Sequence, residues 1–155
     1  MAHRAVKQNP FLDLVEKKMR EIGTGSFLGS DHRKLTEILN EDHERVCALG
    51  LTHDHIAARL AQFTRAAKEE LGDVVFLEDR YEVLAEEVRG LIPCPWGHPG
   101  GLFHKNHIEL RDLKSGEVLF WTDLAVHMIG EHGFYQGKGS PYRLDPERVK
   151  KVLFA

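Results

Sequence analysis

Cysteine and histidine residues gather in one forty-residue stretch of this sequence. Residues 94–133 hold five of the ten histidines and one of the two cysteines. The segment Cys-Pro-Trp-Gly-His at 94–98 offers a metal-ligating side chain at each end of a tight turn. Zinc prefers four such Cys and His ligands arranged as a tetrahedron. The sequence therefore predicts a zinc site made by Cys94, His98, His127 and His132.

The spacing of His127 and His132 sets a condition on this site. Five residues at ~100° each leave the two rings about 140° apart around an ideal helix. The rings converge only if the last helical turn loosens. Gly130 between them and Gly133 after them favour such loosening, because glycine adopts backbone conformations that other residues avoid.

A different histidine could be the fourth ligand. His104 or His107 could replace His98, but residues three apart on a strand point to opposite faces of a sheet. At most one of those two histidines is therefore expected to reach the site. The alternative interpretation is that all these histidines are capping and surface groups and that Cys94 is a small core residue.

The elements that position these residues follow from hydrophobic periodicity and capping signals. Asn-Pro at 9–10 and Asp-Pro at 145–146 are typical helix starts, whereas strand-like alternation begins after residue 73. A helix over 81–89 is the rival of a strand that begins at Tyr81. The predicted helices cover 10–22, 31–49, 53–71, 123–131 and 146–153, and the predicted strands lie at 74–77, 81–85, 107–113 and 117–121.

These elements predict an α+β fold. A helical N-terminal region at 1–72 precedes an α+β region at 73–155, and the two are expected to form one compact domain. The second region combines an antiparallel β-hairpin with the helix at 123–131 as a ββα-like metal module, followed by a C-terminal helix. The order of turn, hairpin and helix brings the predicted zinc ligands together.

Composition excludes several classes of function. The chain has 155 residues and a net charge of −3, which gives no support for a general nucleic-acid binder. It has no apolar run of membrane-spanning length and no signal-peptide core, so a cytoplasmic location is expected. Two cysteines cannot build a disulfide framework, and a metal role for Cys94 is preferred to one disulfide with Cys47.

Enzyme motifs match the same residues only in part. His127-Met-Ile-Gly-Glu-His132 has one residue too many for the inverted zinc-protease order, and His107-Ile-Glu109 lacks the second cysteine of zinc deaminases. No catalytic residue is assigned. The preferred hypothesis is a non-enzymatic interaction or binding module with a structural zinc ion, serving a protein partner or a second copy. The alternative is a metal-dependent hydrolase or nuclease in which Glu131 or Glu109 acts as the base.

Two further clusters have competing interpretations. The loop between Gly133 and Pro146 carries Lys138, Ser140 and Arg143, which could hold an anion, although a glycine-rich connection folded against the core is preferred. His43 and Cys47 lie four residues apart on one helix face and could share a metal, although a core thiol is preferred for Cys47.

Three motifs resemble those of a small family of uncharacterised bacterial cytosolic proteins. The matching segments are VFLEDRYEVLAEEVRGLIPCPW and FWTDLAVHMIGEHGFYQGKGSPYRLDPERV. They place a PCP-aromatic-Gly turn at 93–97, a helix motif at 121–134 and a GSPYRLDP-like tail at 137–146. The likeness covers residues 74–150. It implies a bacterial cytosolic protein and no particular activity.

Overall fold

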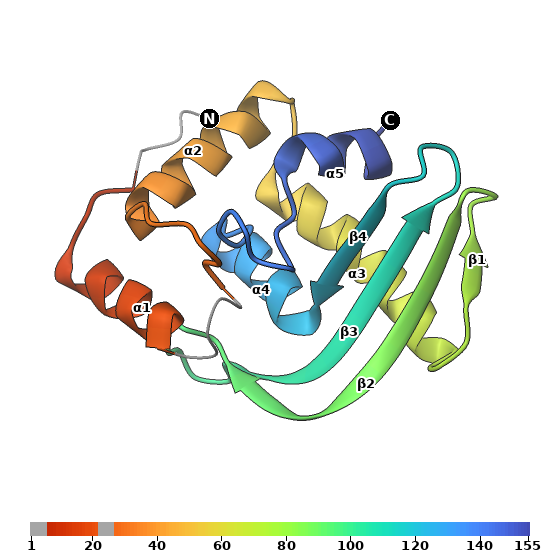
Figure 1. The fold of residues 1–155 in the computed structure, drawn as a ribbon, viewed down its shortest axis with the longest axis horizontal. Helices are drawn as coiled ribbons and strands as arrows, with labels where there is room; N and C mark the ends of the chain where they lie inside the picture. The colour runs from red at the N-terminus through yellow and green to blue at the C-terminus, as the bar shows by residue number, and fades with distance from the viewer. Residues whose placement is uncertain (1–5, 22–26) are drawn as a thin grey trace.

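The computed structural model describes residues 6–21 and 27–155. Within these residues three helices precede a four-stranded antiparallel sheet, and two helices follow it, so the predicted α+β class is confirmed (Figure 1). The elements in chain order are α1 (Pro10–Glu21), α2 (Leu35–Ala48), α3 (His53–Glu69), β1 (Val75–Leu77), β2 (Tyr81–Pro93), β3 (Leu102–Asp112), β4 (Val118–Thr122), α4 (Asp123–His132) and α5 (Pro146–Leu153).

The sheet is a meander in which each strand pairs with its neighbour along the chain. Strand order is β1-β2-β3-β4, and Leu110 of β3 faces Val83 of β2 on one side and Leu119 of β4 on the other. The rival helix at 81–89 is wrong, because the alternation that starts at Tyr81 buries every second residue against the core. The alternating pattern ends after Ala85, and the strand is largely exposed from there on, including the irregularity between Val88 and Leu91.

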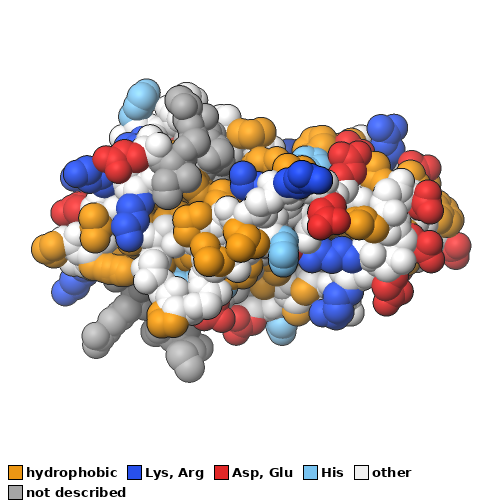
Figure 2. Space-filling model, turned by 90° about the horizontal axis from the view of Figure 1, so that it is seen from below, with side chains coloured by type: hydrophobic (Ala, Val, Ile, Leu, Met, Phe, Trp, Pro, Cys, Tyr) orange, Lys and Arg blue, Asp and Glu red, His pale blue; other side chains and the backbone are white. Residues whose placement is uncertain are grey.

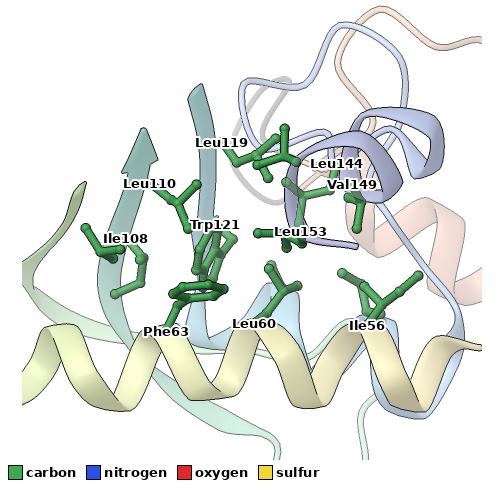
Figure 3. Close-up of a cluster of buried hydrophobic side chains, with 14 of the residues drawn as sticks. Ile56, Leu60, Phe63, Ile108, Leu110, Leu119, Trp121, Leu144, Val149 and Leu153 are labelled. Carbon is green, nitrogen blue, oxygen red and sulfur yellow. The ribbon is translucent and has the colours of Figure 1, made fainter. Parts of the chain in front are cut away.

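The main core lies between α3 and the inner face of the sheet, and α5 closes its far end (Figure 3). Trp121 is fully buried there, and its Nε1–H donates to Thr64 Oγ1 at 2.8 Å. The indole therefore contributes its apolar area without leaving its polar atom unpaired. Other labelled members are Ile56, Leu60, Phe63, Ile108, Leu110, Leu119, Leu144, Val149 and Leu153.

A second apolar cluster positions the predicted metal site. It joins α1 and α2 to α4 and to the turn that follows β2, so it combines residues of both predicted regions. Helix α4 also packs on α3 and β3, which places it between the two clusters. The buried members of this second cluster are Leu12, Val15, Met19, Phe27, Leu28, Leu35, Ile38, Leu39, Cys94, Leu124, Met128 and Phe134.

Helix α2 begins later than the sequence predicts. The predicted start at 31 is wrong: the helix begins at Leu35, and Lys34 precedes it with no side-chain cap. The Asp31 carboxylate instead accepts hydrogen bonds from Arg33 and from the backbone N–H of Lys138. A partner 107 residues away along the chain thus competes with local capping.

The surface is divided between apolar and acidic regions. In the view of Figure 2, hydrophobic side chains occupy the left and central parts of the face, and acidic side chains dominate its right-hand end. The half-exposed hydrophobic residues include Phe11 and Leu14 of α1 and Val88, Leu91 and Leu102 of the β2–β3 pair. No helix among the described residues is long and apolar enough to cross a membrane.

Candidate metal centre

The turn that follows β2 brings Cys94 and His98 close together. Its backbone is closed by hydrogen bonds from Gly97 N–H to Cys94 O at 2.9 Å and from Cys94 N–H to Gly101 O at 2.7 Å. Gly97 has a φ of +70°, a region that glycine enters at little steric cost. A Cβ on Gly101 would lie 2.9 Å from the His98 carbonyl oxygen, so a larger residue there would push the turn apart.

The Cys94 sulfur lies in a setting suited to a metal-bound thiolate. The residue is only 3% exposed, and burial raises the pKa of its thiol. Hydrogen bonds from the backbone N–H groups of Trp96 and Gly97 act in the opposite direction and lower that pKa. Such N–H donors stabilise sulfur in its anionic form, the form in which cysteine binds metals.

Helix α4 supplies the other two histidines. Its N-terminus is capped by Thr122, whose hydroxyl accepts from Ala125 N–H at 3.1 Å. The helix continues through His132, and the left-handed conformation begins only at Gly133, with a φ of +64°. The rings of His127 and His132 nevertheless lie 5.3 Å apart between centroids. Their convergence therefore needs no break within the helix.

Aromatic neighbours hold two of these rings in place. Trp96 stacks on His132 with centroids 4.1 Å apart and an interplanar angle of 3°. Phe103 of β3 lies against His127 with centroids 4.6 Å apart. Both aromatic residues pack on the second apolar cluster, so the imidazoles are fixed from outside the ligand set.

The four predicted ligands meet at one point. The ligand atoms of Cys94, His98, His127 and His132 all lie within 4.8 Å of one another, and this is the one such group found among the described residues. The Cys94 Sγ atom lies 3.6 Å from Nε2 of His132. Zinc–ligand bonds of ~2.0 to 2.3 Å give tetrahedron edges of about 3.3 to 3.7 Å, which this separation matches.

His98 presents its Nε2 atom to the cluster. Its Nδ1–H donates to the carbonyl oxygen of Pro99 at 3.1 Å, which leaves Nε2 as the nitrogen with a free lone pair. That atom lies 2.7 Å from Nε2 of His127. The pair would have to widen by about 0.6 Å to span a tetrahedral edge around zinc. A hydrogen bond from the second ring nitrogen to a carbonyl is the usual support of a metal-bound histidine.

The surroundings of His127 and His132 favour the neutral form of their imidazoles. Burial, followed by the nearby His127 and His98 rings, lowers the pKa of His132 to about 4. Burial, followed by His98, also lowers the pKa of His127. Neutral imidazoles keep the lone pair that a metal requires, whereas protonated ones would repel the cation.

The alternative histidines lie outside the cluster. His104 is exposed on β3, opposite Leu91. His107 lies on the same strand and its Nδ1 is 3.3 Å from the Tyr142 hydroxyl. Neither is among the residues whose ligand atoms converge. The two histidines that the sequence left as substitutes for His98 therefore do not reach the site.

The two other predicted clusters have protein partners. Arg143 forms two hydrogen bonds to the Asp42 carboxylate, so the loop from Gly133 to Pro146 already binds an anion that belongs to the protein. This favours the structural interpretation of the loop over an external anion. The core-thiol prediction for Cys47 is wrong: its side chain is exposed, with Sγ 3.2 Å from His43 Nε2.

The sequence did not single out two residues, Trp96 and Gln136, whose ring stacking or backbone conformation is unusual in the structure. Trp96, which could line a pocket beside the metal but was more readily interpreted as a core residue, stacks on a predicted ligand. Its place inside the Cys-Pro-Trp-Gly turn was the available signal. Gln136 had no functional prediction. Its position among glycines, in Tyr-Gln-Gly-Lys-Gly, was the only trace of its left-handed backbone, with a φ of +73°.

Comparisons with known proteins add nothing to the interpretation of this cluster, which rests on its residues alone. The donor set contains one sulfur and three nitrogens, and no carboxylate is part of it. No protein-family model matches the chain, and comparisons with curated proteins and with solved structures give no significant match.

Proposed function

We propose that Cys94, His98, His127 and His132 bind one zinc ion with a structural role, in a protein that works as a non-enzymatic binding module. The observation that carries this proposal is the convergence of four Cys and His donor atoms within 4.8 Å. They come from a turn and a helix end more than twenty-five residues apart. A zinc ion there would tie the end of β2 to α4.

The donor set favours zinc over other common cations. Magnesium and calcium prefer oxygen ligands, and the cluster offers none. One thiolate and three imidazoles suit a borderline-soft ion that accepts tetrahedral coordination, as zinc does. The backbone N–H groups that hydrogen-bond to Cys94 support the thiolate that such a site needs.

Closure of the site favours a structural role. Structural zinc sites have four protein ligands, whereas catalytic ones keep a position for water or substrate. Glu131 is exposed and is not one of the four residues whose ligand atoms converge, although its charge acts to raise the pKa of His127. Asp123 lies at the other end of α4, where Lys68 and Asn106 each hold it at 2.7 Å. Neither Glu131 nor Asp123 belongs to the converging donor set.

One observation keeps the hydrolase or nuclease as a second candidate. A cavity of about 390 Å³ opens beside His127, with Asp123 and Arg65 in its lining. His98 is half-buried on a glycine-containing turn. If His98 left the metal, a water molecule could take its place and three protein ligands would remain, as in catalytic zinc sites.

Metal content and stability test the structural proposal together. We expect the purified protein to contain one zinc per chain, and Cys94→Ser and His132→Ala to lose it. Since structural zinc contributes about 10 kcal/mol or more of folding free energy in small modules, both variants should melt far below the wild type. A chelator should lower the melting temperature of the wild type and leave the variants unchanged.

Matched controls separate ligand loss from general damage. Cys47→Ser and His104→Ala remove the same side-chain types at exposed positions and should keep zinc and stability. Wild-type protein without zinc, and with a melting temperature indifferent to both zinc and chelator, would contradict the proposal. A hydrolytic turnover that disappears in Glu131→Gln at unchanged zinc content would favour the enzyme instead.

A further inference from the structure

A cavity of about 650 Å³ lies between the far halves of β2 and β3, helix α4 and the loop 133–144. This volume falls within the roughly 300 to 1,000 Å³ typical of small-molecule sites. It is distinct from the metal centre, although the two share α4 and the end of β2. The apolar side chains in its walls include Phe27, Val88, Leu91, Ile92, Leu124 and Met128.

Gln136 brings a buried hydrogen-bond acceptor to this cavity. Its side chain is part of the lining, and the residue is only 4% exposed. Its Oε1 is the one buried side-chain oxygen or nitrogen that has no hydrogen-bond partner among the described residues. Buried polar atoms are nearly always paired, because leaving one unpaired costs the full desolvation of the group. Because Gln136 lines the cavity, this exception points to a donor supplied from outside the protein.

The backbone around Gln136 is fixed in an uncommon conformation. Its φ is +73°, which non-glycine residues adopt rarely and which collects at ligand sites. The Gln136 carbonyl accepts from Arg143 Nη1 at 2.9 Å, and the next N–H, of Gly137, donates to Phe27 O at 2.7 Å. A Cβ on Gly137 would lie 2.4 Å from the Leu28 carbonyl oxygen, so the chain has no space to move aside. Gln136 is therefore held in position before any ligand arrives.

The rest of the lining defines what the cavity can accept. Val88 and Leu91 are each 50% exposed, so apolar side chains of the lining reach the surface beside the exposed Glu86 and Lys105. Glu86 and Lys105 are the two charged lining residues, and their opposite signs leave no net charge for an ionic group. The cavity thus suits an uncharged body with few polar atoms.

We propose that this cavity binds a small, uncharged and largely apolar organic molecule whose single O–H or N–H donor hydrogen-bonds to Gln136 Oε1. The apolar walls cover the body of the ligand, and its donor satisfies the one acceptor that the protein leaves unpaired. The proposal adds a ligand to the binding module proposed above and does not require zinc to be the bound metal.

A matched pair of probes tests the hydrogen bond directly. The full-length protein as purified is titrated with 2-naphthol, which carries an O–H donor, and with 2-methoxynaphthalene, which does not. Binding is followed by two-dimensional NMR of the backbone amides. We expect saturable binding of both probes at the cavity, with 2-naphthol about tenfold tighter because its donor pairs with Gln136. In Gln136→Leu the two affinities should become equal.

A second variant tests the location independently of Gln136. Leu91→Lys places a charge among the apolar side chains of the cavity wall and should weaken both probes about tenfold or more. Leu113→Lys is the matched control, since Leu113 is 48% exposed and lies outside the cavity lining; it should bind both probes as the wild type does. Equal affinities in the wild type, a preference that survives in Gln136→Leu, or equal binding by the two lysine variants would each overturn the proposal. Zinc content measured on the same samples keeps this result separate from the fate of the metal centre.

Discussion

Replacement of Arg143 by alanine leaves the carboxylate of Asp42 buried without the cation that faces it. In the native protein Arg143 Nη2 lies 2.8 Å from Asp42 Oδ1, and Nη1 donates both to the other carboxylate oxygen and to the Gln136 carbonyl. The side chains of the arginine and the aspartate are only 12% and 2% exposed. Burial lowers the pKa of Arg143, but its hydrogen bond to Asp42 and the nearby acids outweigh this and raise it.

The size of the effect follows from this geometry. Removing one partner of a buried ion pair costs about 3–5 kcal/mol, because the remaining charge stays desolvated. For a domain of this length each kcal/mol lowers the melting temperature by about 2–4 °C. Arg143→Ala should therefore melt roughly 6–20 °C below the wild type. The loss should appear as a lower urea midpoint with an unchanged slope, since the surface exposed on unfolding is the same.

A double-mutant cycle identifies the cause. Arg143→Met and Asp42→Leu should each destabilise the protein, and the double variant should recover much of the loss because it buries no charge. Arg148→Ala is the matched control: Arg148 pairs with Glu117 at 2.8 Å on the surface, and its loss should matter far less. The reasoning is refuted if Arg143→Ala costs less than about 1 kcal/mol, or if the double variant loses the sum of the two single losses.

The remaining predictions concern the thiols and the stability of the protein at acid pH. Cys47 is exposed and Cys94 is buried, so a thiol reagent should modify the first rapidly and the second only after chelation or unfolding; equal rates in Cys47→Ser and Cys94→Ser would contradict this. Hydrogen bonding to Arg80 lowers the pKa of the buried Asp112 below its ordinary value. The stabilisation that this ionised carboxylate gives the folded protein is therefore complete above the unfolded pKa of ~4, and about 2 kcal/mol of it is lost as pH falls below that value. An acid titration of Asp112→Asn should not show this loss.

Most helices could be predicted because their signals are local. Asn9 Oδ1 accepts from Leu12 N–H at 2.9 Å at the start of α1, and Asp145 caps α5 ahead of Pro146. The start of α2 could not be predicted in this way. There Asp31 accepts a hydrogen bond from the backbone N–H of Lys138, in a loop far along the chain. Helix propensities depend on residue type alone and do not include such a long-range contact.

The convergence of the four Cys and His residues was predictable for the same reason, up to a limit. A turn closed by glycines and a helix end each present two candidate ligands within six residues, and the order of elements brings them together. The choice of His98 over His104 and His107 depends on the course of β3, which the sequence alone does not specify. The stacking of Trp96 on His132 and the unpaired oxygen of Gln136 likewise depend on contacts between distant segments.

The proposed metal centre and the proposed ligand cavity are built on the same two elements. Pro93 lines the cavity and immediately precedes Cys94, while Met128 lines it and immediately follows His127. A zinc ion bound by those two ligands would hold the end of β2 at a fixed distance from α4. It would thereby fix two walls of the cavity relative to each other, and a site fixed before binding loses less freedom when its ligand enters. A structural metal would in this way serve the binding function without contacting the ligand.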